Sequence, residues 1–289
     1  MRRLLGTIGI LLIASACAGP PAEPPGTAST APTPTASSST TASPQSSPPN
    51  ARQITVQVWF VHAGKLFVAT RRQDFQPAVG RLSLEALLAG PTEAERRAGL
   101  ATAIPEGASL SGLTIRNGVA TVNLSLDFAI DKTARLEDLR LAQVVYTLTQ
   151  FSTVKSVTFQ VNGQTIQEFG SHPQSLARPQ TRRDYDELLP AIVVTSPAIG
   201  ASVSSPVLVK GTANVFEATV SLRILDASGR QIARTFTTAT CGTGCRGDYA
   251  KKVGFSVSSK QDGTIEVFEA SAQDGRAINV VKIPVTLLP

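Results

Sequence analysis

The chain has 289 residues, 42% of them hydrophobic, which is enough for two domains of ordinary size. Its formal net charge of +6 is spread along the sequence, and only 5% of its residues are aromatic. No basic run alternates with aromatic side chains, so the composition argues against a protein that binds nucleic acid.

The first sixteen residues have the pattern of a secretory signal. Arg2 and Arg3 supply the positive start, and the apolar run at residues 4–16 is too short for a membrane-spanning helix. Small residues then lead into Cys17. This pattern resembles a bacterial lipoprotein signal, which implies a cleaved peptide at residues 1–16 and a lipid such as palmitate on Cys17. We therefore expect anchoring to the cell membrane, facing outside the cytoplasm. The alternative is an ordinary secretory signal with a chance cysteine.

Residues 18–50 are almost entirely Pro, Ser, Thr and Ala, and Glu23 is their only charged residue. Such a segment has too few apolar side chains to offset the entropy of ordering. We therefore expect residues 17–51 to form a disordered tether, which would reach on the order of 100 Å when extended. Its many hydroxyl groups would also permit O-glycosylation.

Residues 52–170 predict an α+β domain with the order ββαββαβ, in which the helices cover one face of a small sheet. Tight turns are expected at Asn117-Gly118 and Asn162-Gly163, since this pair is the strongest short hairpin signal. The patterns predict strands at residues 53–58, 65–70, 112–116, 119–124 and 156–161, and helices at residues 81–89 and 133–151.

The sequence of this first block resembles the GerMN domain, a family of sporulation and spore germination. The strongest matches are residues 141–151 (LAQVVYTLTQF) and 157–163 (VTFQVNG), and further matches are residues 88–91, 104–107 and 118–125. The resemblance implies a fold related to the ring-building motifs of envelope assemblies. It brings no catalytic residues.

A turn-rich stretch at residues 171–189 contains a charged cluster at 182–187 and is expected to be a linker. Residues 190–289 then predict an all-β sandwich of immunoglobulin type. Its seven expected strands lie at residues 192–195, 207–210, 219–225, 231–237, 251–257, 264–269 and 278–287. Residues 192–197, 200–203 and 211–220 resemble the immunoglobulin-like domain of bacterial spore germination.

Residues that could support catalysis or metal binding are few. The two histidines, His62 and His172, are far apart and stand in no zinc-binding spacing, so no metal or other cofactor is expected. Residues 152–155 match Ser-x-x-Lys, but they follow a predicted helix instead of opening one, and the partner motifs of penicillin-binding enzymes are missing. The carboxylate pairs Asp184/Asp186 and Glu266/Glu269 are expected to be solvated surface.

Cys241 and Cys245 form an even pair in an oxidising compartment, and the two glycines between them allow the chain to double back. A disulfide is the favoured interpretation. A redox-active pair would need a lowered thiol pKa and usually a tighter spacing, and a metal site would need two further ligands. The neighbouring Arg246-Gly247-Asp248 is expected to be an exposed turn.

The sequence therefore predicts a non-catalytic, lipid-anchored envelope protein that binds or scaffolds another envelope protein or copies of itself. The alternative is a module that recognises wall glycan or another carbohydrate. Carbohydrate sites usually present aromatic platforms, yet Trp59 is the only tryptophan and is expected in a strand core. An enzyme or a regulator of one is a third alternative. The family names imply a link to sporulation or germination.

Overall fold

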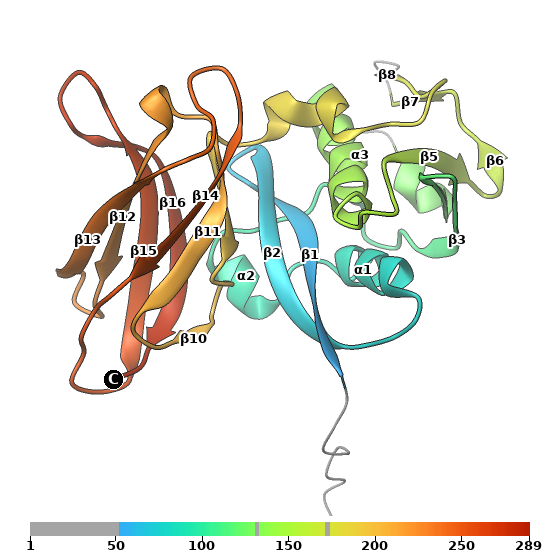
Figure 1. The fold of residues 1–289 in the computed structure, drawn as a ribbon. Helices are drawn as coiled ribbons and strands as arrows, with labels where there is room; N and C mark the ends of the chain where they lie inside the picture. Colours follow the sequence, from blue (N-terminus) through green and yellow to red (C-terminus); the bar gives the residue numbers. More distant parts are fainter. Residues whose placement is uncertain (1–51, 131–132, 171–173) are drawn as a thin grey trace, which may run out of the picture. The chain divides into compact units, whose positions relative to one another are not determined.

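The computed structural model describes residues 52–130, 133–170 and 174–289, all of which belong to one compact unit spanning residues 48–289. The expected signal peptide, Cys17 and the expected tether lie outside the described residues. Within the described ranges, no helix combines the length and the apolar character needed to cross a membrane. The unit consists of an α+β domain followed by a β-sandwich (Figure 1). Both predicted fold classes are confirmed, but the single small sheet expected in the first domain is wrong, because the hairpin of β1 (Gln53–His62) and β2 (Lys65–Asp74) forms a sheet of its own on the other side of the helices.

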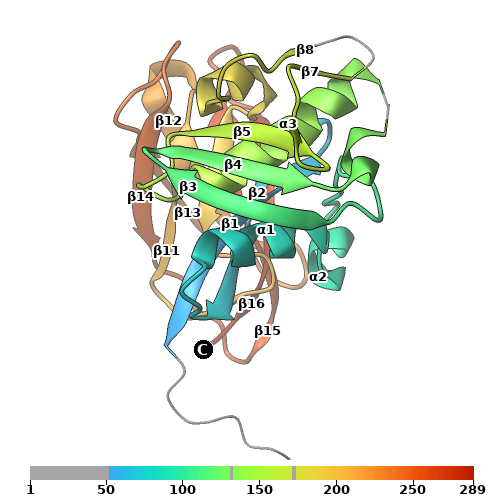
Figure 2. The same ribbon diagram turned by 90° about the vertical axis from the view of Figure 1, so that its right-hand side faces the viewer.

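The first domain contains two sheets with helices between them (Figures 1 and 2). The hairpin β1–β2 is a sheet by itself, and β3-β4-β5-β6 form the other, with β4 parallel to β5. Helices α1 and α3 contact β1 on one side and the second sheet on the other. The elements are β1 (Gln53–His62), β2 (Lys65–Asp74), α1 (Val79–Leu88), α2 (Glu93–Arg97), β3 (Leu110–Arg116), β4 (Val119–Leu124), η1 (Leu126–Ala129), α3 (Ala134–Leu148), β5 (Ser156–Val161) and β6 (Gln164–Thr165).

Side chains from α3 and the turn after it form hydrogen bonds with backbone groups on the edge of β1 that faces away from β2. The Gln143 side chain donates to the Trp59 carbonyl oxygen at 2.9 Å, and the Thr147 hydroxyl accepts from the Trp59 N–H at 3.1 Å. Gln150 exchanges two bonds of 2.7 Å with the backbone of Gln57. Because buried backbone groups need partners, this polar row takes the place of a neighbouring strand.

Arg71 on β2 connects the end of α1 to the start of α2 through hydrogen bonds. Its guanidinium donates to Glu95 and to the carbonyl oxygens of Ala86 and Gly90, at 3.0 Å to each carbonyl. Glu95 in turn completes a capping box with Thr92 at the start of α2. The five-residue helix α2, which the sequence patterns missed, therefore depends on a partner from the hairpin.

The described part of the predicted linker, residues 174–189, packs against the first domain. After the short strands β7 (Glu168–Phe169) and β8 (Gln174–Ser175), Gln180 exchanges backbone bonds with Val157 at 2.7 and 2.8 Å. The 3-10 segment η2 (Arg182–Leu188) then lies on α3, and its Tyr185 and Leu188 are fully buried.

The second domain is a two-sheet sandwich. One sheet has the order β10-β16-β15-β12-β13 and the other the order β14-β11-β9. Apolar side chains that alternate along the strands fill the space between the sheets. The strands are β9 (Ile192–Ser196), β10 (Ser202–Val203), β11 (Val207–Ala213), β12 (Thr219–Leu225), β13 (Gln231–Thr238), β14 (Gly247–Val253), β15 (Gln261–Ala270) and β16 (Ala277–Leu287), with a 3-10 turn, η3 (Phe216–Ala218), before β12.

Two expectations for this domain are wrong at β14. The strand expected at residues 251–257 ends at Val253, and the N–H of Phe255 bonds to the Ser205 hydroxyl at 3.0 Å instead of to a neighbouring strand. The strand begins earlier than expected, because Gly247 and Asp248 pair with β11. These two residues therefore do not form an exposed turn, and Gly247 is buried.

The two domains share apolar packing. Phe67 on β2 and Ile199 after β9 each pack against both hydrophobic cores. A polar contact accompanies them, since the Thr70 hydroxyl donates to the Thr195 carbonyl oxygen at 2.9 Å. The hairpin β1–β2 is thus the surface of the first domain that holds the sandwich.

Candidate functional site

A half-open pocket of about 720 Å³ lies where the two domains meet, and we call it the junction pocket. Its lining comes from β1, α3 and η2 on one side, and from β9, β11, β14 and the loop before β14 on the other. Both domains must therefore fold and pack together before this pocket exists. Its position fits the general preference of ligand sites for domain interfaces.

Arg182 forms the first-domain wall of the pocket. Its guanidinium carbon lies 4.7 Å from the ring centroid of Tyr146 and 5.6 Å from that of Trp59, in cation–π contact with both rings. The same side chain donates to the Thr149 hydroxyl at 2.8 Å and to the Tyr146 carbonyl oxygen at 3.0 Å. The C-terminal end of α3 therefore fixes the arginine in place.

Tyr146 joins the helix to η2 beneath this arginine. Its hydroxyl donates to Asp186 Oδ1 at 2.9 Å. Burial, and then the negative charge of Asp186, raise the pKa of the Tyr146 phenol. The phenol is consequently a neutral hydrogen-bond donor at physiological pH and no candidate for a base.

Arg246 faces the pocket from the sandwich. It donates to the Pro190 carbonyl oxygen at 2.6 Å and makes longer contacts of 3.4 Å with the Ala191 carbonyl oxygen and the Thr212 hydroxyl. Burial lowers the pKa of both Arg246 and Arg182, while Tyr146 and Asp186 act in the opposite direction on each. Among the described residues, neither arginine has a carboxylate within salt-bridge distance.

Trp59 contributes an unsatisfied donor to the same pocket. Its side chain is only 3% exposed, and its indole Nε1 has no hydrogen-bond partner. Buried indole N–H groups normally find one. The lining of the pocket thus includes two guanidinium groups without carboxylate partners and a tryptophan whose buried N–H has no acceptor.

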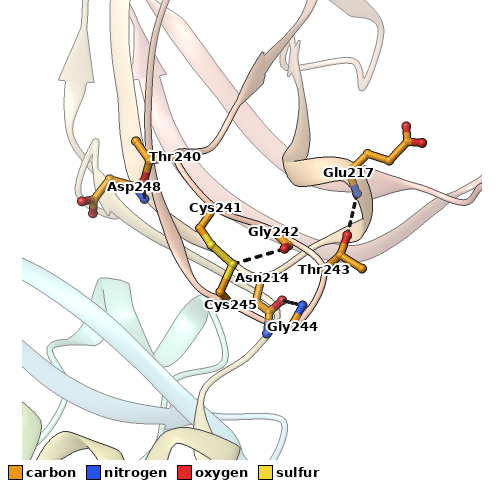
Figure 3. The surroundings of a disulfide bond; sticks show 9 residues. All are labelled: Asn214, Glu217, Thr240, Cys241, Gly242, Thr243, Gly244, Cys245 and Asp248. Atoms are coloured by element: carbon orange, nitrogen blue, oxygen red, sulfur yellow. Dashed lines mark hydrogen bonds between the residues drawn. A yellow bond between two sulfur atoms is a disulfide. The ribbon is translucent and has the colours of Figure 1, made fainter.

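The disulfide loop stands directly before Arg246. Cys241 and Cys245 are bonded between β13 and β14, and Figure 3 shows the loop folded against the chain around Asn214. The N–H of Gly244 donates to the Asn214 side chain at 3.0 Å, and the N–H of Glu217 donates to the Thr243 hydroxyl at 3.0 Å (Figure 3). The loop therefore fixes the start of β14, and with it the position of Arg246.

The structure does not gather the other sequence candidates into a site. His62 is exposed beside the Phe67 ring, and His172 lies outside the described residues. Ser152 and Lys155 occupy the turn between α3 and β5. Within the described residues, no group of three or more His, Cys, Asp or Glu side chains could hold a metal ion.

The carboxylates considered from the sequence have structural partners. Asp184 accepts from Arg178 and from the backbone N–H of Thr181. Glu266 is 3% exposed and lies between Arg223 and Lys282 on the outer face of the five-stranded sheet. They are therefore elements of the fold, and Glu266 is not the solvated surface residue expected.

Sequence reasoning missed the convergence of Trp59, Tyr146, Arg182 and Arg246. Each residue gave a local signal: Trp59 was the single tryptophan, Arg182 stood in the charged cluster, and Arg246 followed a cysteine. No spacing along the chain predicted that they would meet, since the pairing of the two domains brings them together.

Comparison with known families identifies both domains. Residues 50–167 match the family described as sporulation and spore germination, and residues 191–276 match the immunoglobulin-like domain of bacterial spore germination. The chain therefore carries a GerMN domain followed by this immunoglobulin-like domain, as the sequence resemblances predicted. Families of these two kinds are non-catalytic in type.

Solved structures provide three further likenesses. The tandem GerMN domains of the sporulation protein GerM from Bacillus subtilis are 15% identical, with a TM-score of 0.41, covering 70% of this chain and 61% of that one. The first GerMN domain of the same protein is 20% identical over 45% of this chain and 99% of that one, with a TM-score of 0.39. A putative lipoprotein from Clostridium perfringens is 20% identical over 47% and 93%, with a TM-score of 0.35. No curated protein matches the chain.

Proposed function

We propose that this chain is a non-catalytic binding or scaffolding protein of the bacterial envelope, anchored outside the cytoplasm by lipid on Cys17. The partner we propose is another envelope protein or a second copy of the chain. The family descriptions supply the link to sporulation or germination. One observation carries the proposal: the two domains are packed together, so they present their surfaces in a fixed relation.

That fixed relation is unusual for modules that act independently. Domains joined by a linker move relative to each other unless their interface is substantial and apolar. Here Phe67 and Ile199 belong to both cores, and η2 is packed on α3 before the sandwich begins. Rigid presentation suits a scaffold, because ordering has been completed before the partner binds.

The glycan-binding alternative receives less support from the same geometry. Trp59 and Tyr146 are 3% and 1% exposed, and Arg182 lies over both rings. A neutral sugar usually stacks on an open aromatic face. Neither of these two rings offers one, so the junction pocket gives a neutral sugar no open stacking surface on them.

Two experiments test the proposal with the full chain expressed in a bacterial host. In the first, cells fed labelled palmitate should transfer the label to the chain, and Cys17→Ala should abolish the labelling. A chain that takes up no label, or a variant that still takes it up, would contradict a lipid anchor on Cys17.

In the second, crosslinking in living cells should join the tagged chain to a defined envelope protein or to itself. Phe67→Asp should reduce that crosslinking because it opens the shared packing, whereas Phe75→Asp, at a phenyl ring that is 42% exposed, should not. Capture of wall fragments alone, with no protein crosslink, would count against the scaffold.

A further inference from the structure

We propose that the junction pocket binds an anionic group, a carboxylate or a phosphate, carried by a polymer outside the cytoplasm. This inference rests on the proposed binding function and assigns a ligand chemistry to one site within it. The observations are the charge of the pocket, its free donor and the way its donors are held.

The charge of the lining is positive. Arg182, Arg246 and Lys210 lie around the pocket, against the carboxylates of Asp186 and Asp248. Asp186 is already engaged by the Tyr146 hydroxyl, and neither arginine is salt-bridged among the described residues. Both guanidinium groups are half-buried without a carboxylate partner, so an anion that enters the pocket gains their attraction, which offsets the cost of their partial desolvation.

The remaining donors match the oxygens of such an anion. Arginine presents a planar fork of N–H groups that pairs bidentately with carboxylate or phosphate. Arg182 uses its Nε and Nη2 atoms toward Thr149 and Tyr146, and no contact of its Nη1 atom is recorded within the described residues. Trp59 lines the same pocket, and its buried indole N–H also lacks an acceptor. An anionic oxygen would supply what both donors lack.

These donors are held before any ligand arrives. Arg182 is clamped by the end of α3 and by two aromatic rings, as its contacts above show. Arg246 is held by the Pro190 carbonyl oxygen and follows the disulfide at Cys245. Fixed donors cost little side-chain entropy on binding, so the arrangement is suited to recognition.

A neighbouring hollow indicates that the anion belongs to a longer molecule. This second pocket, of about 1000 Å³, shares Gln57, Thr195 and Lys210 with the junction pocket. It continues between β2 and the segment that follows β9. The two pockets adjoin at these three residues and together offer more room than a free inorganic ion needs, so a polymer chain could extend from one into the other.

Trp59 is the single tryptophan, so its indole signal reports on this pocket alone. We would label the tryptophan of the full lipidated chain with ¹⁵N, in detergent micelles, and titrate it with three compounds. Muramyl dipeptide supplies a carboxylate, glycerol 3-phosphate a phosphate, and diacetylchitobiose a neutral sugar. We expect a saturable shift of the indole N–H resonance with at least one anion and none with the neutral sugar.

The response also identifies the source of the anion. A shift with the dipeptide alone indicates wall peptides, and a shift with the phosphate alone indicates phosphate polymers. No shift with either anion, or an equal shift with the neutral sugar, would overturn the inference.

Two variants test the assigned residues. Arg246→Gln should weaken anion binding about tenfold, and Lys210→Gln, at an exposed position that is easier to change, about threefold. Lys252→Gln is the matched control, because Lys252 is exposed on the neighbouring strand and outside the lining. If Arg246→Gln does not fold, the affinity of Lys210→Gln for the anion tests the assignment. Affinities within twofold of the original chain for every folded variant would refute the assignment.

The anion titration and the crosslinking experiment test the two proposals separately. If the chain still crosslinks to its envelope partner but neither anion shifts the indole resonance, the pocket assignment is wrong and the scaffold proposal is supported. If the anions bind but no protein partner is crosslinked, the scaffold proposal is wrong and the assignment of the pocket as an anion site is supported.

Discussion

Gln143 donates its side-chain N–H to the carbonyl oxygen of Trp59 at 2.9 Å, from the middle of a helix to the edge of a strand. The other end of the same amide accepts from the Ala103 N–H at 2.8 Å. Gln143 is fully buried, and its bond to Trp59 lies away from water, whereas its bond from Ala103 is only partly buried. One polar side chain on the buried face of α3 thus connects this helix, β1 and the segment before β3.

Replacing this residue tests how much the connection contributes. Gln143→Leu keeps a similar volume but leaves the buried Trp59 carbonyl and the partly buried Ala103 N–H without these bonds. We expect the free energy of unfolding to fall by about 2–4 kcal/mol, measured by urea denaturation. Gln164→Leu, at an exposed position on β6, should stay within about 0.5 kcal/mol. Equal effects of the two substitutions would contradict this role.

Arg71→Met should destabilise the first domain more strongly. The Glu95 side chain is 7% exposed and would lose its cationic partner, at a cost of about 3–5 kcal/mol. The double variant Arg71→Met/Glu95→Leu should recover part of that loss, because no lone buried charge remains. Arg81→Met, in a salt bridge whose two side chains are 43% and 52% exposed, serves as control, with a change of about 1 kcal/mol or less. A double variant no more stable than Arg71→Met would refute the explanation.

Asp184 should make stability depend on acid pH. Hydrogen bonds from Arg178, and then from the backbone and hydroxyl of Thr181, lower the pKa of Asp184 from 3.8 to about 2. Since the folded pKa is depressed, this contribution is present above about pH 4 and is lost as the pH falls through about 2. Asp184→Asn should therefore lower the melting temperature at pH 6, and the difference should shrink between pH 4 and pH 2. Asp262→Asn, at an exposed position, serves as control. If the difference in melting temperature between Asp184→Asn and the original chain does not change with pH, the prediction is wrong.

Removal of the disulfide should have a modest effect. A loop closed by Cys241 and Cys245 is short, so its crosslink stabilises the fold by about 2 kcal/mol at most. The loop also keeps its backbone bond from Thr243 to Val215 and its bond from Gly244 to Asn214, both 3.0 Å. We expect Cys241→Ser/Cys245→Ser to lower the melting temperature by a few degrees. Reductant should lower the melting temperature of the original chain to that of the variant and should not change the melting temperature of the variant. Unfolding of the sandwich at room temperature in the variant would contradict the prediction.

Local chemistry explains why much of the fold was predictable. Asn117-Gly118 and Asn162-Gly163 all have positive φ angles, from 48° to 81°, as such hairpin turns require. Alternation also located most of the sandwich strands. It failed at Phe255 and Val257, which keep the alternating pattern after β14 has ended, because alternation records which side chains face the core and not which backbones pair.

The candidate site was not predictable by the same means. Trp59, Arg182 and Arg246 lie on a strand, a 3-10 turn and a loop that are distant in the sequence. Their meeting depends on how one domain packs on the other, which no short-range pattern records. The polar row on α3 and the turn after it did leave a signal, since Gln143, Thr147 and Gln150 recur at helical spacing within an apolar stripe.

The packing of η2 determines where the protein can be divided. A fragment that ended at residue 167, with the first family match, would lack Tyr185 and Leu188, which fill the core against α3. Such a cut leaves cavities as large as those of several core truncations. Because Phe67 and Ile199 serve both cores, heating should melt the two domains in one cooperative transition, and neither should be a stable protein alone.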